Sequence, residues 1–270
     1  MPVVCAASAV VSPPPQRYHE DPSILAFYRD LVEPFGAEVD EQLLHAGTNV
    51  SHRELVDTLV KAEDVRGCQA DLIIVTHGLP DLHPFTAVAS HLNMLFGGGA
   101  QSFSISEQGL AAPFTALRIV ASFQRSGRAN QAVVAVLEQT TLPTRHALVQ
   151  DPPLVDSGAL LVFGRGAGLR VDEVGTVGSQ EAISTRVREF EAGDPSGTLL
   201  VIGPWVDWDG VDAGSRVHRV EPGSYCTSVW LELARHWRRW QQDYTTVVLC
   251  DVDPRTHRGH FAVLRTSPAE

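Results

Sequence analysis

The sequence has few basic residues, and no part of it forms a long hydrophobic run. Lysine and arginine together number 21 against 32 aspartates and glutamates, which gives a formal net charge of −11. A general nucleic-acid-binding surface needs an excess of positive charge, so that function is disfavoured, although a local basic patch is not excluded. No apolar stretch approaches the roughly 18 residues that cross a bilayer. The sequence therefore predicts neither a nucleic-acid partner nor a membrane segment.

Cysteine is also scarce. The chain has four cysteines, with no C-x-x-C pair and no metal-ligand spacing among them: Cys5, Cys68, Cys226 and Cys250. We therefore expect reduced thiols, no metal site and no cofactor. The first residues, 1–6, carry no basic side chain, and their apolar run ends at Pro13–Pro15, which is not typical of a secretory signal. These features favour a cytoplasmic location.

What is present is an ordinary globular composition. The 270 residues are 44% hydrophobic and 20% charged, which is too apolar for a disordered chain. This length suits one large domain or two closely packed halves, because it can bury a substantial core. We predict two halves, 1–165 and 166–270.

The first half alternates strands and helices. Apolar runs predict buried strands at Asp71–Thr76 and Ala132–Leu137, with a short strand at Gln101–Ser106 between them. A helix is expected from Pro84 to Phe96. A second, Leu110–Arg125, is apolar almost all round and should be buried centrally. This order of elements predicts an α/β fold.

The flanking regions give weaker signals. Short helices are expected at Ile24–Val32 and Val39–Leu44, and the Ser51 and Glu54 pair predicts a capping box. From Ala159 onward we expect further elements: paired strands at Leu160–Phe163 and Leu169–Val174, a strand at Leu199–Ile202, a helix at Ser228–Gln242, and a final strand pair at Val247–Cys250 and Phe261–Leu264.

An ordered series of motifs resembles one family. Its members are the strand at Asp71–Thr76, the stretch Phe103–Ala112, the D-S-G-A segment at Asp156–Ala159, Gly223–Ser228 and the closing Gly259–Leu264. In this order they resemble the β-ketoacyl synthase III-like proteins of the thiolase superfamily, well over residues 70–163 and loosely over 220–265. The resemblance implies an αβαβα layered thiolase fold with two pseudo-repeated halves, the second shortened. It also implies a dimer that acts on thioesters of coenzyme A or an acyl-carrier protein.

The sequence departs from that family at its catalytic positions. Counting back from Ala116-Leu117 places the family's nucleophilic cysteine at Leu110, and Ser224 stands where the family has asparagine. Only Pro204-Trp205 follows the strand after which the family's histidine is expected. Leucine cannot form a thioester, so the leading hypothesis is a catalytically degenerate synthase-like subunit. It would shape a pocket or support an active partner in fatty-acyl or polyketide-type biosynthesis.

Several side chains remain candidates for chemistry. Glu107 and Gln108 precede the buried helix, whose first amides suit an oxyanion, but Gln108 lies two residues before the nucleophile position. His77 follows a central strand, where open α/β sheets place ligands. Cys226 could act as a displaced nucleophile or be a buried apolar residue. The expected pocket consists of five residues: His77, Gly109, Leu110, Trp205 and Ser224.

Two further hypotheses concern partners. Arg235, Arg238 and Arg239 lie on the outer face of a predicted helix, where they could bind an acidic acyl-carrier protein or simply be solvated. The strand at Gln101–Ser106 is expected to pair across a homodimer, or with a cysteine-containing synthase. The alternative functions are a cysteine-independent acyltransferase, decarboxylase or thioesterase that uses the same pocket, and a small-molecule-binding protein.

Overall fold

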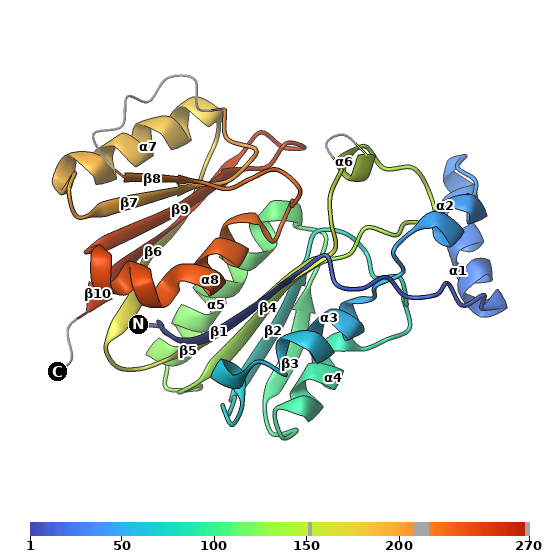
Figure 1. Ribbon diagram of the computed structural model, residues 1–270, viewed down its shortest axis with the longest axis horizontal. Coiled ribbons are helices and arrows are strands. Elements are labelled where there is room, and N and C mark those ends of the chain that lie inside the picture. Colours follow the sequence, from blue (N-terminus) through green and yellow to red (C-terminus); the bar gives the residue numbers. More distant parts are fainter. Residues whose placement is uncertain (151–152, 208–215, 268–270) are drawn as a thin grey trace.

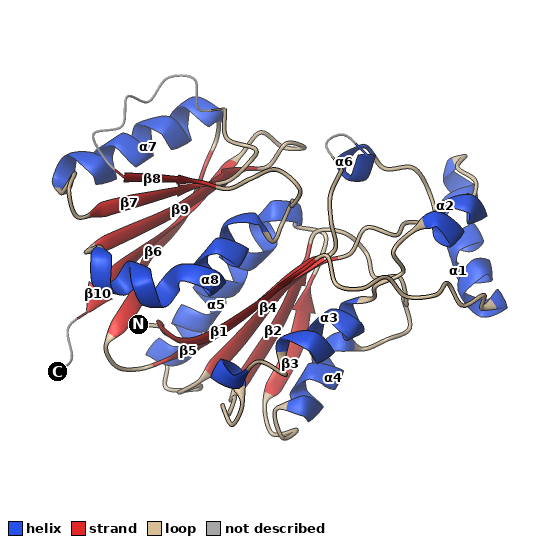
Figure 2. Ribbon diagram, viewed as in Figure 1, coloured by secondary structure: helices blue, strands red, loops and turns tan. Residues whose placement is uncertain are grey.

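The computed structural model describes residues 1–150, 153–207 and 216–267. Figure 2 shows a mixed α/β molecule. Its strands are β1 (Val3–Val11), β2 (Leu72–His77), β3 (Gln101–Ile105), β4 (Ala132–Glu138), β5 (Ser157–Gly164), β6 (Gly168–Val177), β7 (Thr198–Ile202), β8 (Arg216–Arg219), β9 (Thr246–Val252) and β10 (Gly259–Ser267). Its α-helices are α1 (Pro22–Val32), α2 (Glu41–Ala46), α3 (His52–Leu59), α4 (Val88–Leu95), α5 (Ala112–Arg125), α6 (Ala147–Gln150), α7 (Gln180–Gly193) and α8 (Ser228–Asp243).

The strand order repeats within the chain. All the strands join one 10-stranded sheet in the order β3-β2-β4-β5-β1-β6-β10-β9-β7-β8. Read from each outer edge inward, both halves show the same sequence of strands: third, second, fourth, fifth, first. In each half the fifth strand, β5 or β10, is antiparallel to its two neighbours. The halves meet where Val3 of β1 pairs with Arg170 of β6.

Helices and sheet form layers (Figure 1). Helices α5 and α8 lie between the two halves, α3 and α4 cover the outer face of the first half, and α7 covers the outer face of the second. The side chains of β2 show why its sequence is a continuous apolar run. Leu72 and Ile74 join the central core with α5 and α8, whereas Ile73 and Val75 join the outer core under α3 and α4. Both faces of the strand are buried, as predicted.

Helix α5 is central but not fully enclosed. A 3-10 turn at Gly109–Ala111 precedes it, and Pro113 occupies its first turn, where a missing N–H costs little. Most of its side chains are buried, but Arg118, Ser122 and Arg125 form one exposed stripe. The expectation of burial on nearly all sides is therefore too strong, since one face of α5 reaches solvent.

Local signals were reliable in the first half. The capping box at Ser51 and Glu54 is present at the start of α3, and α1 matches its predicted range closely. Helix α4 begins at Val88 rather than Pro84, because a turn with a bond from the Thr86 amide to the His83 carbonyl occupies that stretch. None of the described helices has the length and apolarity needed to cross a membrane.

At the boundary between the halves, the predicted pairing of two consecutive strands is wrong. Strands β5 and β6 do not form a hairpin: β5 pairs with β1 and β4, and β6 pairs with β10. The short connection between them carries the chain from one half to the other, so neighbours in sequence are not neighbours in the sheet. The final pair, β9 with β10, is confirmed. The shortening of the second half falls on its connections, because all five strands are present, whereas among the described residues α1, α2, α4 and α6 have no counterpart.

Candidate functional site

The turn between β3 and α5 has the sharp geometry expected of an elbow. Glu107 has a φ of 60° and Gly109 a φ of 52°, both in the left-handed region. Glycine suits the second position for a further reason, because a β-carbon there would collide with the hydroxyl of Tyr225. The residue at the start of the helical turn, where the resemblance places the nucleophile, is the buried Leu110.

The side chain of Tyr225 fills the space in front of this elbow. It has no exposed surface, and its ring packs between Gly78, at the end of β2, and Gly109. Its hydroxyl donates a 3.2 Å hydrogen bond to Oδ2 of Asp253 and lies near the Leu110 backbone. Burial raises the pKa of Tyr225, so the phenol stays protonated. The space in front of the elbow is thus occupied by the protein itself.

Four of the five predicted pocket residues gather around this tyrosine. Gly109 and Leu110 touch it from the elbow, and the Trp205 ring stands perpendicular to its ring with centroids 6.2 Å apart. The Trp205 indole N–H donates to the carbonyl of Ser224 over 3.0 Å. These residues are brought together as packed core around Tyr225, not as the lining of an empty pocket.

Cys226 is enclosed and unactivated. It has no exposed surface, and its thiol lies 3.3 Å from the carbonyl of Leu137. Burial raises the pKa of the thiol well above its ordinary value, and the nearby Glu138 adds to this effect. A reactive cysteine needs a lowered pKa and access to substrate. The geometry therefore suits the structural interpretation of Cys226.

Two buried carboxyl groups near the elbow were missed by the sequence analysis. Glu138, at the end of β4, accepts bonds from the amides of Tyr225 (2.8 Å) and Cys226 (2.6 Å), and burial raises its pKa to about 7. Asp251, at the end of β9, accepts a 2.7 Å bond from the Ser228 hydroxyl, and burial likewise raises its pKa to about 7. Each is an acidic residue that directly follows an apolar strand run, which was the available signal.

Glu107 and Gln108 lie on the surface, outside the Tyr225 core. The Gln108 side-chain carbonyl accepts a 2.7 Å bond from the Thr115 hydroxyl of α5. Both residues line an open cavity of about 390 Å³, together with Gly109, Ala111, Asp253, Arg255, Thr256, Arg258 and His260. Neither Arg255 nor Arg258 forms an ion pair with a described carboxylate. This cavity offers a polar surface of mixed charge beside the elbow.

His77 lines a different cavity. This space, of about 620 Å³, is bordered by His52, His77, Asp81 and Glu107 among others, and Gly78 separates it from Tyr225. The His52 and His77 rings lie 4.8 Å apart, and burial lowers the pKa of both. Nδ1 of His77 lies 2.8 Å from the Leu79 carbonyl. His77 is therefore not placed beside Leu110, Trp205 and Ser224.

The three arginines proposed for carrier binding are exposed, and each has an acidic neighbour in the chain. Arg235 pairs with Glu232 at 2.8 Å, Arg238 with Asp64 at 3.0 Å and Arg239 with Asp243 at 3.1 Å. Exposed ion pairs of this kind are weak, so a partner's carboxylates could replace them.

A separate group on β8 and α8, namely His218, Glu232 and His236, is close enough to hold a metal ion.

Comparison with known proteins identifies the fold. No protein-family model and no curated protein matches the sequence. The structure is similar to 3-oxoacyl-(acyl carrier protein) synthase III of Pseudomonas aeruginosa, with a TM-score of 0.63, 16% identity, and 99% of this chain and 98% of that chain covered. For OleA of Xanthomonas campestris the values are 0.64, 13%, 98% and 98%. For AbyA1, a tetronic acid condensing enzyme, they are 0.66, 14%, 98% and 100%. The predicted thiolase fold is confirmed.

Proposed function

We propose that this chain is a catalytically degenerate β-ketoacyl synthase III-like subunit of fatty-acyl or polyketide-type biosynthesis. It would bind an acyl thioester or its carrier, and support a partner, without becoming acylated itself. The observation that carries this proposal is the closed elbow. The resemblance assigns the nucleophile position to the buried Leu110, and Tyr225 fills the space in front of the elbow.

The chemistry of the elbow supports the absence of condensation. Forming an acyl-enzyme requires a nucleophile at the helix start and a free amide to stabilise the oxyanion. The Leu110 side chain has no nucleophilic atom, and the Tyr225 hydroxyl lies close to the backbone at Gly109 and Leu110. No described side chain at this point combines access with an activated nucleophile, because Cys226 is buried and its pKa is raised.

The open cavity beside the elbow supports retained recognition of a thioester carrier. Arg255 and Arg258 line it together with two acidic residues, Glu107 and Asp253, and with Gln108 and His260. Guanidinium groups bind phosphate in a bidentate manner, and coenzyme A and the acyl-carrier prosthetic group both carry phosphate. The same cavity favours the alternative, a cysteine-independent acyltransferase, decarboxylase or thioesterase, if its polar groups act on the thioester.

The chain is expected to remain unacylated after incubation with acyl-coenzyme A. Intact-mass spectrometry should show less than about 0.1 acyl group per chain, because the one buried thiol near the elbow is protonated. Cys5 is exposed and could react nonspecifically. A Cys5→Ser variant is therefore the matched control, and peptide mapping assigns any adduct.

A stoichiometric adduct that persists in Cys5→Ser and does not map to the partly exposed Cys68 would overturn the degenerate function. If that adduct maps to Cys226 and disappears in Cys226→Ser, the chain is an acyl-transferring enzyme with a displaced nucleophile. Steady release of free coenzyme A without an adduct would instead indicate the thioesterase alternative. The absence of both results, with coenzyme A still binding, is the outcome that the closed elbow predicts.

We further propose that the chain dimerises through β3, either with itself or with a cysteine-containing synthase. Strand β3 is an outer edge of the sheet and, among the described residues, pairs with β2 alone. Exposed edges invite strand addition, and natural proteins usually cover them. Helix α4, which packs beside β3, also leaves Met94 64% exposed and Leu95 42% exposed. An apolar surface next to an open edge supports a partner at this face.

Light scattering after size exclusion should give the mass of a dimer. We expect this either for the chain alone or after co-expression with a cysteine-containing synthase encoded by a neighbouring gene. Ser104→Lys, at an exposed position of β3, should shift the population towards monomer by about tenfold in the dissociation constant, because a lysine on an edge strand hinders strand addition. Ser122→Lys, on the exposed stripe of α5, is the control. A monomer under both conditions would remove the subunit function.

A further inference from the structure

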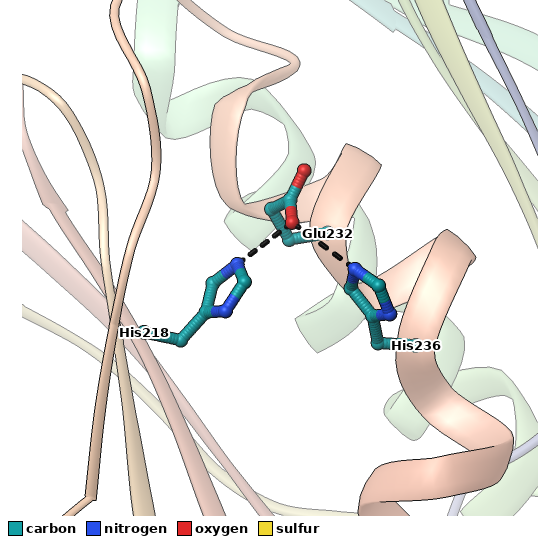
Figure 3. A group of neighbouring side chains, drawn as sticks. All are labelled: His218, Glu232 and His236. Atoms are coloured by element: carbon teal, nitrogen blue, oxygen red, sulfur yellow. Dashed lines mark hydrogen bonds and ion pairs between the residues drawn. The ribbon is translucent and has the colours of Figure 1, made fainter.

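Three side chains of the second half converge on one point (Figure 3). Nε2 of His218, on β8, lies 2.7 Å from Oε2 of Glu232, on α8. Nε2 of His236, one helical turn further along α8, lies 3.4 Å from the same oxygen. One potential ligand atom from each residue falls within 4.8 Å of the other two. Two imidazoles that share a single carboxylate oxygen form an unusually compact group of donor atoms.

The surroundings fix this arrangement. The Glu232 side chain is only 13% exposed, and Arg235 donates to its other oxygen, Oε1, over 2.8 Å. Oε2 is thereby left to face the histidines. The ring of the buried Trp240 packs against both imidazoles, with centroid distances of 5.5 Å in each case. The three donors are held by a strand, a helix and a buried indole, so little conformational freedom is lost when they bind a ligand together.

We propose that His218, Glu232 and His236 form a binding site for a zinc ion. Two imidazoles and one carboxylate are a donor set that Zn²⁺ takes, with a fourth position left for water. In a tetrahedral site, ligand atoms about 2.0–2.2 Å from zinc lie about 3.3 Å from one another. The shortest contact here, 2.7 Å, needs to open by only a small side-chain rotation. Both histidines are about one-third exposed, which leaves that fourth position accessible.

A zinc ion at this site would cross-link the edge strand of the second half to a central helix. Strand β8 has four residues and, within the described part of the chain, pairs only with β7. His218 of this strand contacts α8, which is a central helix of the fold. A bound ion would join the edge strand to that helix through coordinate bonds, so zinc would stabilise the folded state in proportion to its binding. This role is independent of the elbow and of the proposed subunit function.

Calorimetric titration of the chelator-treated full chain with Zn²⁺ tests the site. We expect about one equivalent to bind, with a rise in melting temperature, whereas Mg²⁺ and Ca²⁺, which prefer all-oxygen sites, produce neither effect. His218→Ala and His236→Ala should each weaken zinc binding by at least about tenfold. Glu232→Gln keeps the shape of the side chain but loses its charge, and should weaken binding to a similar extent.

The matched control is His91→Ala. His91 also contacts a carboxylate, Asp57, at 2.7 Å, but that pair has no third ligand among the described residues. This variant should bind zinc like the unaltered chain. Circular dichroism verifies that each variant is folded, and Glu232→Gln serves if a histidine variant is not. Zinc binding that is unchanged in the folded His218, Glu232 and His236 variants, or absent from the parent chain, would overturn the proposal.

Discussion

Replacing Ala116 by aspartate is expected to lower the free energy of unfolding by more than about 3 kcal/mol. Ala116 has no exposed surface and lies in the central core, where α5 packs between the two halves. A carboxylate at this position would lose its hydration without gaining a partner, and the surrounding side chains leave no space for its extra atoms. Urea denaturation followed by circular dichroism measures the change.

Ser122→Asp is the control on the same helix. Ser122 is exposed on the one stripe of α5 that reaches solvent, beside Arg118 and Arg125. Its replacement should change the free energy of unfolding by no more than about 0.5 kcal/mol. If Ala116→Asp denatures at the same urea concentration as the parent chain, α5 is not a central helix and the layered arrangement is wrong.

Glu138→Gln is expected to remove a large part of the pH dependence of stability. The pKa of Glu138 is raised from 4.5 to about 7 by burial, so the folded state holds its proton at pH values where the unfolded chain has released it. The contribution is fully present below pH 4.5 and is lost as the pH rises through about 7. A shift of this size corresponds to about 3 kcal/mol.

The free energy of unfolding should therefore fall between pH 5 and pH 8 in the parent chain, and fall by about 3 kcal/mol less in Glu138→Gln. Asp251, whose pKa is also raised to about 7, should make its own contribution to the pH dependence of the free energy of unfolding in both proteins. Glu221→Gln, at an exposed position just before α8, is the control and should follow the parent. Parallel pH profiles for Glu138→Gln and the parent would mean that the two amides keep Glu138 ionised.

The sequence predicted the architecture best where elements are buried on both faces. The apolar runs of β2 and β4 and the helix α5 were found because a continuous hydrophobic stretch has few other interpretations. Helix α7 was missed, since its core contacts, Ile183, Val187 and Phe190, are sparse in a polar sequence. The pairing of β5 and β6 was wrong, because sequence patterns identify strands but not their neighbours across a repeat boundary.

The sequence suggested the candidate site through a resemblance, but it gave no indication of how the site is packed. That Leu110 stands at the nucleophile position stays a prediction from the resemblance. That Tyr225 closes the elbow could not be predicted, because a tyrosine in a loop can as easily face solvent. The grouping of the proposed zinc ligands could not be predicted from the sequence for a similar reason. His218 and Glu232 are 14 residues apart on different elements, and only the fold brings them together.

In two places a carboxyl group of one half contacts the loop before the central helix of the other half. These carboxyl groups also affect the electrostatic potential at the elbow. A helix behaves as if its first turn carried roughly half a positive charge. Glu138 of the first half accepts bonds from the amides of Tyr225 and Cys226, in the loop that leads into α8, and Asp253 of the second half lies beside Gly109, in the turn that leads into α5. Each half thus places a carboxyl group before the first turn of the other half's central helix. An anionic reaction intermediate arriving at the elbow would meet the Asp253 carboxyl group as well as the helix dipole.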